Sequence, residues 1–514
     1  MKRAVISVSD KTGVVDFARG LVALGYQIIS TGGTSKTLRE EGLQVTDVSD
    51  VTGFPECLEG RVKTLHPAVM AGILARDTED HRKTIADLGI EMIDIVAVNL
   101  YPFQATIAKA GVTEAEAIEK IDIGGPSMIR AAAKNSDRVT VIVDHADYKP
   151  VLEELARDGK TSDQTRRRLM VKVFAMTAAY DMAVAGHFGR IDGALPDVAF
   201  AGGVKVSELR YGENGHQRAA VYVPAGTVPK GMIGARQLQG KELSYNNYVD
   251  MDAAWALVRE FDDRPAVSII KHTNPAGFGW DRESLHHAYE KALATDPVSA
   301  FGGIVALNRE VDEKLAERLN EHFYEVIICP SLTAGARDFF AKKKNLRVME
   351  MGDDFFQPMP DLVFKQVSGG MLVQDNDPPA NEVSGARVVT KRQPTREEWD
   401  ALECAWKVSK HVKSNAIVFC FNDRTGAVGA GQMSRVDSAR LAVMKAADRK
   451  IDLNGTVVGS DAFFPFADGV EEIAKAGATA IAQPGGSIRD QEVIDAADRM
   501  GLAMVFTGTR HFRH

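Results

Sequence analysis

Lys271 and His272 stand side by side at the end of an apolar run, "IIKHTNPAGFGW" (269–280), and could do acid–base chemistry there. Neighbouring side chains of a strand point to opposite faces, so inside a buried strand the pair would place a charge among apolar groups. We therefore expect the strand to stop at the pair and Asn274-Pro275, with Gly277, to form a turn. A lone histidine is more often structural. The neighbouring Lys271 shifts that balance, because a nearby cation disfavours imidazolium and keeps His272 available as a neutral base.

Two loops near the N-terminus have the composition of an anion site. "STGGTSKTL" (30–38) places Gly32 and Gly33 between a predicted strand and a helix, where backbone N–H groups and the helix dipole can approach an anion. A tight connection is the simpler interpretation of one Gly-Gly turn. However, "VSDKTG" (8–13) ends the preceding strand in the same way and offers Lys11 to a phosphate. Two such loops from neighbouring parallel strands would face one crevice.

Other stretches of the N-terminal third carry cationic, carboxylate and phenolic groups. They are Arg61, Lys63, Thr64 and His66 in "GRVKTLHP", Tyr101 in "NLYPF", and Asp122 and Lys134 in "IDIGGPSMIRAAAKN". Arg61 and Lys63 share a face if their segment is extended, and the alternative is a solvated basic loop. Neither GxGxxG nor GxxxxGK[ST] occurs, so the usual dinucleotide and ATP signatures are missing.

The second half offers a further anion or ring site. "ELRYGENGHQ" (208–217) contains Arg210 and Tyr211, whereas His216 could equally be a structural hydrogen-bonding group. "SDAFFPFADG" (460–469) and "QPGGS" (483–487) are predicted to be loops lining a pocket, although the phenylalanines alone would indicate core.

Size and composition limit the classes of protein. A chain of 514 residues predicts two to four domains, and 45% hydrophobic with 26% charged residues is typical of a soluble protein. The net charge of −8 gives no general basic surface for nucleic acid. No apolar stretch is expected to reach membrane-spanning length. Four scattered cysteines without a CxxC pair favour a reducing, cytoplasmic location.

The elements that must position these groups follow from hydrophobic periodicity. Four strands are expected at 4–9, 26–30, 94–100 and 138–144. Between the first two, one helical stripe contains Val14, Phe17, Ala18, Leu21 and Val22. The pattern predicts a doubly wound α/β domain with a parallel sheet.

The rest of the chain predicts a second α/β region. A helical stretch (150–190) ends in Gly- and Pro-containing sequence, so a boundary is placed near residue 197. No internal repeat stands out, and the polar segment 374–396 looks like a connection between two lobes. The expected strands beyond the boundary are 266–270, 303–307, 416–420, 426–430 and 502–506.

Eight stretches, in order along the chain, closely resemble one family of purine biosynthesis: the bifunctional 5-aminoimidazole-4-carboxamide ribonucleotide (AICAR) formyltransferase and IMP cyclohydrolase. The stretches are "GRVKTLHP", "DIGGPSMIRAAAKN", "LRYGENGHQ", "KHTNPAG", "DPVSAFGG", "AGQMSR", "SDAFFPF" and "RHFRH". The resemblance implies a methylglyoxal-synthase-like cyclohydrolase domain (1–197) and a formyltransferase domain (198–514) of two cytidine-deaminase-like lobes. It further implies 10-formyltetrahydrofolate as co-substrate, no catalytic metal, and a cytoplasmic homodimer acting on AICAR, formyl-AICAR and IMP. The H-x-E and P-C-x-x-C signature of zinc deaminases is absent.

The resemblance also implies roles for single residues. In the transferase, Lys271 would stabilise charge and His272 would take the proton of the 5-amino group. AICAR would be held by Arg210, Tyr211, Gly302, Glu325, Asn415 and Arg435. The folate side or the rest of the pocket would be formed by Val436, Phe463, Asp468, Gly485, Gly486, Arg510 and Phe512.

In the cyclohydrolase, the implied proton-handling groups are Lys63, Tyr101, Asp122 and Lys134, with acid and base roles left open. The nucleotide would be bound by Ser9, Asp10, Lys11, Thr31, Gly32, Gly33, Thr34, Arg61, Val62, Thr64, Asn99 and Ile123. This chain departs from the family's usual pattern at Gly215 and at Met70, where a histidine is frequent.

Two alternatives belong to other classes. The N-terminal domain could be a regulatory nucleotide-binding module, since methylglyoxal-synthase-like domains also serve as sensors; Lys63 and Lys134 favour catalysis instead. A hydrolytic deaminase is disfavoured by the missing zinc ligands.

Overall fold

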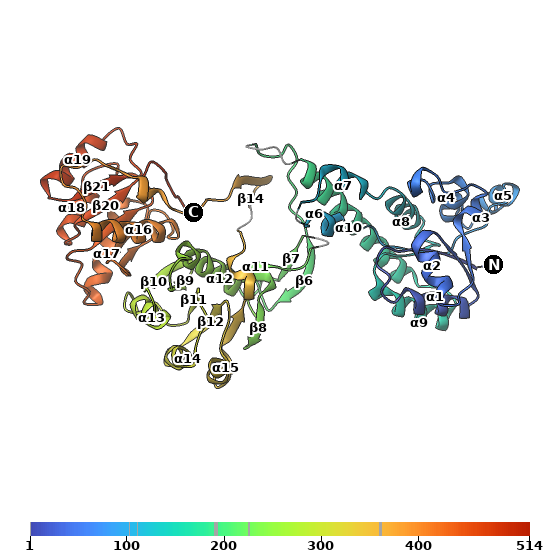
Figure 1. Ribbon diagram of the computed structural model, residues 1–514, viewed down its shortest axis with the longest axis horizontal. Coiled ribbons are helices and arrows are strands. Elements are labelled where there is room, and N and C mark those ends of the chain that lie inside the picture. The colour runs from blue at the N-terminus through green and yellow to red at the C-terminus, as the bar shows by residue number, and fades with distance from the viewer. Residues whose placement is uncertain (1, 102, 110, 190–193, 225–226, 359–361) are drawn as a thin grey trace. The chain divides into compact units, whose positions relative to one another are not determined.

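In the computed structural model, drawn as a ribbon in Figure 1, the first five strands of the chain form one parallel sheet. Their order is β3-β2-β1-β4-β5. The structure describes residues 2–101, 103–109, 111–189, 194–224, 227–358 and 362–514. The strands are β1 (Lys2–Ser7), β2 (Tyr26–Ser30), β3 (Val45–Asp47), β4 (Ile95–Val98) and β5 (Thr140–Ile142). Four of them confirm the predicted strands, and the short β3 was missed.

Helices accompany this sheet in alternation with the strands. They are α1 (Val14–Ala23), α2 (Gly32–Glu40), α3 (Val48–Thr52), α4 (Pro67–Leu74), α5 (Glu79–Asp87), α6 (Phe103–Ile107), α7 (Glu114–Glu119), α8 (Gly124–Lys134), α9 (Tyr148–Asp158) and α10 (Asp163–Phe188). In α1 the predicted stripe is buried except for Val22, which is 43% exposed. Val22 was therefore assigned wrongly, because it lies at the edge of the apolar stripe. The strand order reverses between β1 and β4, where open α/β sheets bind ligands.

The long helix α10 corrects another prediction. Within the part of the chain that the structure describes, α10 alone is long and apolar enough to cross a membrane by length and composition. The expectation that no stretch reaches that length is therefore wrong. In the structure α10 packs against β5 and α8, and Leu169, Val173 and Tyr180 join the core of this sheet.

The chain packs as two compact units. One comprises Met1–Val204 with Tyr222–Thr227, and the other comprises Lys205–Val221 with Val228–His514. Residue 197, where the sequence placed the boundary, lies in the irregular segment between α10 and β6 (Val204–Leu209).

The second unit contains two sheets with the same topology. The first has the order β10-β9-β11-β12-β13-β8, and the second, written in reverse, has the order β18-β17-β19-β20-β21-β16. Each strand of the first sheet corresponds to the strand eight numbers later in the second. The parallel and antiparallel pairings also agree one by one. The lobes are thus a structural duplication, although the sequence shows no repeat.

The bounds of these elements are as follows. The first lobe has β8 (Arg236–Gln239), β9 (Ala266–Lys271), β10 (Asn274–Trp280), β11 (Gly303–Leu307), β12 (Tyr324–Cys329) and β13 (Arg347–Glu350), with helices α11 (Gly231–Gly234), α12 (Tyr245–Val258), α13 (Leu285–Leu293), α14 (Glu313–Asn320) and α15 (Ala334–Ala341). The second has β16 (Arg387–Val388), β17 (Ile417–Cys420), β18 (Thr425–Gly429), β19 (Val457–Ser460), β20 (Ala480–Gln483) and β21 (Ala503–Phe506), with α16 (Arg396–Lys410), α17 (Arg435–Asp448), α18 (Asp468–Lys475) and α19 (Asp490–Arg499). Two hairpins stand apart from both sheets: β6 with β7 (Ala219–Val223), and β14 (Leu362–Val367) with β15 (Gly370–Asp375).

The two lobes share one hydrophobic core. Helix α12 lies along β9 and β11, and α16 lies along β17 and β19 (Figure 1). Apolar residues of both sheets and both helices belong to the same buried cluster. The edge strands β10 and β18 also meet, because the backbone N–H of Phe278 donates to Thr425 Oγ1 at 2.9 Å. The five strands predicted beyond residue 197 are confirmed as β9, β11, β17, β18 and β21.

The turn after Lys271 differs from the predicted one. The chain reverses at His272 and Thr273, with φ of +52° and +60°, and Asn274 already begins β10. The predicted turn at Asn274-Pro275 and Gly277 is therefore wrong. Gly277 lies within β10. A glycine is required there because a Cβ would stand 1.9 Å from the carbonyl oxygen of Ala292 on α13.

The contact between β10 and β18 predicts a stability effect. Thr425 is fully buried, and its hydroxyl also bonds to Thr295 Oγ1 at 2.8 Å. Thr425→Val should lower the free energy of unfolding of the second unit by about 1–3 kcal/mol, because it leaves the Phe278 N–H without a partner. Thr425→Ser keeps the hydroxyl and should lose less. Denaturant unfolding of both variants measures the difference, and equal losses would show that the hydroxyl is not the cause.

Candidate active sites

The loops after β1, β2 and β4 meet at the carboxyl edge of the first sheet. Thr34 Oγ1 accepts from the backbone N–H of Val8 at 3.0 Å and donates to the Val8 carbonyl at 2.9 Å. Asn99 accepts the backbone N–H of Asp10 at 3.1 Å and donates to the Asp10 carbonyl at 2.9 Å. The two glycine-containing loops therefore lie side by side, and the crevice that both would face stays a prediction. The φ of +53° at Gly32 suits glycine.

Lys11 and Lys63 bring two cations to this crevice. Burial lowers the pKa of Lys11, whose Nζ donates to the Val8 carbonyl at 2.9 Å. A Cβ built on Gly33 would lie 3.8 Å from Lys11 Nζ, and one on Gly32 would lie 3.8 Å from Lys63 Nζ. Both ammonium groups thus flank the start of α2, where backbone N–H groups attract anions.

The segment that carries Lys63 is a tight, irregular loop. Leu58, Glu59 and Gly60 have φ of +53°, +57° and +90°, and Arg61 has helical dihedral angles. The extended conformation in which Arg61 and Lys63 would share a face is therefore not observed. Arg61 instead pairs with Glu119 of α7 on the surface.

Asp122 lies at the start of α8, beside Tyr101. Its Oδ1 accepts the backbone N–H of Gly125 at 2.9 Å, and its Oδ2 accepts that of Tyr101 at 3.4 Å. Burial raises the pKa of the Asp122 carboxyl, and the nearby Lys63 ammonium opposes this only in part. A carboxyl with a raised pKa in a cleft is a candidate acid or base.

Lys134 does not lie with this group. It is the last residue of α8 and is exposed, whereas Asp122 precedes the first residue. The rise of a helix separates the two ends of α8 by about 15 Å. The structure therefore brings together Lys63, Tyr101 and Asp122, but within one chain it leaves Lys134 at the other end of the helix. Ile123, beside Asp122, is 60% exposed.

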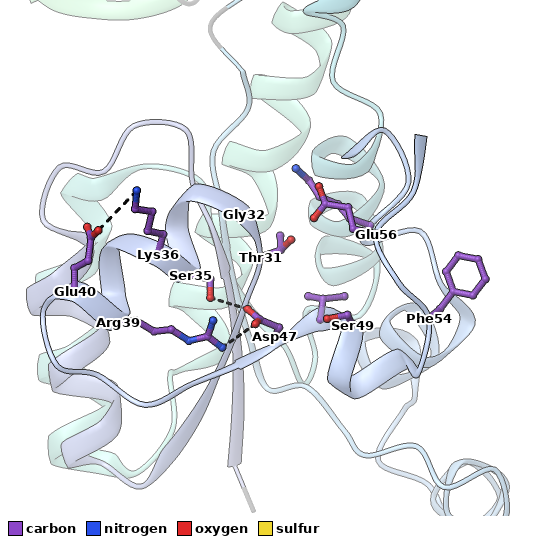
Figure 2. A pocket seen from close by; sticks show the side chains of 12 residues that line it. Thr31, Gly32, Ser35, Lys36, Arg39, Glu40, Asp47, Ser49, Phe54 and Glu56 are labelled. Carbon is purple, nitrogen blue, oxygen red and sulfur yellow. Dashed lines mark hydrogen bonds and ion pairs between the residues drawn. The ribbon is translucent and has the colours of Figure 1, made fainter. Parts of the chain in front are cut away.

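A cavity of about 430 Å³ opens beside the crevice and is lined in part by Thr31, Gly32 and Lys63. Figure 2 shows Ser35 and Arg39 both pointing to Asp47, whose oxygens accept from them at 2.7 and 2.8 Å. A smaller cavity of about 260 Å³ includes Val62 and Lys63 among its lining residues. Space for a small ligand therefore lies on both sides of Lys63.

In the second unit, Lys271 and His272 close the β9–β10 turn. Lys271 Nζ donates to the carbonyl of Gly302 at 2.9 Å, so these two predicted site residues are in contact. His272 is exposed. Asn274 reaches the second lobe, because its Oδ1 accepts the backbone N–H of Lys413 at 2.9 Å, two residues before Asn415.

Glu325 and Arg347 form a charged cluster on neighbouring strands. Glu325 Oε2 accepts from Asn247 Nδ2 at 2.9 Å and lies 3.9 Å from Arg347 Nη1. Burial lowers the pKa of Arg347, and the Arg210 cation lowers it further. Arg210 itself stacks on Tyr211 with 4.7 Å from its guanidinium to the ring centre. Two guanidinium groups beside one carboxylate would suit a phosphorylated sugar.

Asn415 and Arg435 are joined in the second lobe. Arg435 Nη2 donates to Asn415 Oδ1 at 2.9 Å, and its Nη1 donates to Ser460 Oγ at 2.8 Å and pairs with Asp461. This arginine is buried, while Val436, the next residue, is partly exposed. Its internal partners fix its position before any ligand arrives.

The remaining predicted pocket residues lie on loops of the same lobe. Phe463 is partly exposed, and Asp468 begins α18. Gly485 and Gly486 have φ of +72° and +96°, and a Cβ on Gly485 would stand 2.4 Å from the Phe506 ring. Arg510 stacks on Phe512 at 4.5 Å in the last residues of the chain.

The C-terminal segment is held in place. The Arg513 carbonyl accepts the backbone N–H of Ser414 at 3.0 Å, and Lys413 Nζ donates to the terminal residue His514 at 2.8 Å. His511 is buried, with Nδ1 2.7 Å from Asp377 Oδ2. β21 is hydrogen-bonded within its sheet, as predicted, so the last residues continue an ordered strand.

The chain is similar to known proteins over its whole length. Residues 132–445 match the AICARFT/IMPCHase bienzyme family, and residues 13–127 match the MGS-like (methylglyoxal-synthase-like) domain. Two curated relatives, named "Bifunctional purine biosynthesis protein PurH" in Desulfitobacterium hafniense strains DCB-2 and Y51, are each 52% identical over the full length of both chains. The chain belongs to the AICARFT/IMPCHase bienzyme family.

As a member of this family, the chain catalyses the last two steps of IMP synthesis. It transfers a formyl group from 10-formyltetrahydrofolate to AICAR and then closes the formylated product to IMP. Strands β2, β3 and β4 of the parallel sheet of the first unit fall within the MGS-like match. A solved structure titled "Crystal structure of ForH" is 40% identical over 37% of this chain and 99% of its own, with a TM-score of 0.34.

Several groups that support the bienzyme's predicted sites were missed in the sequence. Tyr180 of α10 accepts the backbone N–H of Asp122 at 2.8 Å, and Asp250 of α12 accepts that of Thr273 at 2.7 Å. Asn247, which bonds to Glu325, was missed for the same reason: these partners are distant in sequence. Among the described residues, no group of three or more His, Cys, Asp or Glu could hold a metal ion.

The raised pKa of Asp122 predicts opposite effects on activity and stability. The Asp122 carboxyl loses its proton more readily in the unfolded state than in the native state. The burial of Asp122 therefore destabilises the native state at pH values above the ordinary carboxyl pKa, and not below it. Asp122→Asn should therefore abolish cyclisation yet raise the melting temperature at pH 7, with no gain near pH 3. Asp137→Asn, at an exposed site, is the control. A variant that melts below the wild type at pH 7 would contradict this account.

Proposed function

We propose that the two reactions occur in separate units, with cyclisation in the first and formyl transfer in the second. The observation that carries the proposal is the division of the predicted residues. Those assigned to cyclisation lie between Ser9 and Lys134, and those assigned to formyl transfer lie between Arg210 and Phe512. In the first set, Tyr101 and Lys63 lie near Asp122, and in the second, Lys271 contacts Gly302 beside His272.

For formyl transfer, the 5-amino nitrogen of AICAR attacks the formyl carbon of 10-formyltetrahydrofolate, and His272 removes the proton of that amino group. The bond from that carbon to N10 of the folate then breaks, and N10 takes up a proton. Lys271 stabilises the negative charge that develops on the formyl oxygen. An aromatic amine is a weak nucleophile, so positioning and deprotonation must both contribute.

The remaining assignments concern the ligands. Arg210, with Arg347 nearby, supplies positive charge for the phosphate of AICAR, and Glu325 is suited to its ribose hydroxyls. Asn415 and Arg435 supply further nucleotide contacts. The folate side comprises Val436, Phe463, Asp468, Gly485, Gly486, Arg510 and Phe512.

For cyclisation, the carboxamide nitrogen of formyl-AICAR attacks its formyl carbon, and water leaves. Asp122, with its raised pKa, and Lys63 are the groups best placed to move protons, with Tyr101 beside them. The loops containing Lys11 and Thr31 to Thr34 bind the phosphate at the start of α2. Lys134, assigned to the same step by resemblance, would have to act across about 15 Å within one chain.

Separate sites predict separable losses. His272→Ala should lower the rate of formyl transfer by about 10²- to 10⁴-fold and leave cyclisation of added formyl-AICAR unchanged. Lys63→Ala should do the reverse. The two steps are assayed as release of tetrahydrofolate and as formation of IMP. Equal losses of both activities in either variant would show a shared site or a misfolded chain.

Lys134→Ala separates two interpretations of the cyclohydrolase. Loss of cyclisation comparable to that of Lys63→Ala would support the assignment by resemblance, and full activity would reject it.

We further propose that two copies of the chain associate through the β14–β15 hairpin. An isolated two-stranded sheet is marginal in water, and within the described chain no third strand pairs with it. Val363, Val367 and Leu372 share one face of the hairpin and are 41%, 36% and 59% exposed. The same face also carries Lys365 and Gln374, and a second copy would cover its exposed apolar side chains.

This association can be tested by light scattering. Val363→Glu with Leu372→Glu should convert a dimeric mass into a monomeric one, because two carboxylates would be buried in an interface that buries apolar side chains in the wild type. Gln366→Glu, on the opposite face, should leave the dimer intact. A dimer that survives the double substitution would place the interface elsewhere.

Two broader assignments complete the proposal. The matching topology of the two lobes supports a common ancestor fold, for which a cytidine-deaminase-like origin is proposed. A cytoplasmic location is supported by the four cysteines, all of which are free thiols.

A further inference from the structure

The turn that presents His272 has a backbone conformation that its residues disfavour. Both central residues have positive φ, as in a type I′ turn, where asparagine and glycine are preferred. Thr273 is β-branched, so its φ of +60° is a genuine outlier. Such conformations persist only where the surroundings enforce them.

Asp250 supplies that enforcement from α12. Its Oδ1 accepts the backbone N–H of Thr273 at 2.7 Å, a short charge-assisted hydrogen bond. Asp250 is half-buried, and burial raises the pKa of its carboxyl. The backbone N–H groups of Thr273 and His272 and the side chains of His272 and Lys271 lower that pKa, but they offset only part of the effect of burial. The stability of α12 does not explain why this carboxylate is half-buried beneath the turn, because the N-terminus of α12 is already capped by Ser244.

The opposite side of the turn is held by a second contact. Asn274 Nδ2 donates to the carbonyl of His272 at 3.1 Å, while its Oδ1 accepts from Lys413 of the second lobe. The His272 backbone is thus fixed between α12 and the segment 413–415. Its side chain, which is exposed, is aimed by the backbone and not by packing.

We propose that Asp250 is a positioning residue for formyl transfer: by holding the Thr273 N–H, it keeps the left-handed turn that aims the His272 imidazole at the 5-amino group. This inference rests on the proposed role of His272. Asp250 touches no substrate, so its removal should misplace the base and leave substrate binding intact. A misplacement of this kind costs up to about 10²-fold in rate.

The first test compares removal of the acceptor with its conservative replacement. Asp250→Ala should lower kcat for formyl transfer about 10- to 100-fold, with KM for AICAR and for folate changed less than about threefold. Asp250→Asn keeps an oxygen acceptor and should restore kcat to within about threefold of wild type. Cyclisation of formyl-AICAR reports on the first unit and should not change. A loss that appears only in KM would overturn the proposal.

A matched control is available in the same lobe. Asp281 likewise accepts backbone N–H groups of a turn, from Glu283 and Ser284 at 3.1 and 3.0 Å, after β10. Asp281→Ala should lower the melting temperature without lowering kcat. If Asp281→Ala and Asp250→Ala reduce kcat equally, the effect is general destabilisation and the proposal fails.

Two double variants test the mechanism directly. Thr273→Gly permits positive φ without a clamp, so adding it to Asp250→Ala should recover most of the lost kcat. In a His272→Ala background, Asp250→Ala should cost nothing further, because both changes remove one function. No recovery with glycine, or additive losses, would show that Asp250 acts in another way.

The result for His272→Ala alone distinguishes failure of the proposed catalytic role of His272 from failure of the positioning role of Asp250. An active His272→Ala enzyme would reject the proposed catalytic role and, with it, the positioning role of Asp250. An inactive His272→Ala enzyme together with a fully active Asp250→Ala enzyme would reject only the positioning role.

Discussion

The second unit depends on one buried carboxylate, Glu260, where its two lobes meet. Glu260 Oε1 accepts from Lys410 Nζ at 2.8 Å and from His411 Nε2 at 3.0 Å, and its Oε2 accepts the backbone N–H of Ala380 at 3.0 Å. These partners hold its pKa at about 2 although burial opposes this. His411, whose pKa burial lowers to about 4, is neutral and accepts at Nδ1 from Arg513. Lys410 therefore carries the compensating charge. Because the partners come from the end of α16, the connecting segment and the C-terminus, this network joins these three segments to the first lobe at Glu260.

The duplication of the lobes explains why such a network is needed. Each lobe buries one face of its sheet against its own outer helices and the other against the shared layer of α12 and α16. That shared layer is apolar, and the hydrophobic effect that stabilises it is non-directional. The hydrogen bonds of Thr425 at the strand edges and of Glu260 at the helix ends set a single register. The positions of Asn274 and Lys413, and so of the proposed base and the nucleotide contacts, follow from that register.

Much of the fold could be predicted because it depends on local patterns. Apolar runs located nine of the strands, and the Gly-Gly loop after β2 was correctly placed between a strand and a helix, since strand ends and helix starts leave a signal in neighbouring residues. The β9–β10 turn was misplaced because its conformation contradicts local preference: Asn274-Pro275 looks like a turn, and His272-Thr273 does not. The duplication could not be predicted from the sequence. Many different sequences keep the same strand pairing and core volume, so the two lobes share a topology without sharing a sequence repeat. Tyr180, Asn247 and Asp250 were missed because each acts on a partner far away in the chain.

At the β9–β10 turn, the residues that local conformational preference favours differ from those that the proposed function needs. A sequence optimised for stability would put asparagine and glycine at positions 272 and 273 and leave Asp250 solvated. This chain instead has a histidine and a threonine there, and it holds them with a carboxylate whose burial is unfavourable. Asp122 and Tyr180 repeat the arrangement in the first unit, where a half-buried carboxyl with a raised pKa is fixed through its backbone by a hydroxyl from α10. In both units the local departure from stability is matched by one distant hydrogen bond. Such pairs of a strained or buried group and its remote partner are expected where a side chain must be held ready to move a proton.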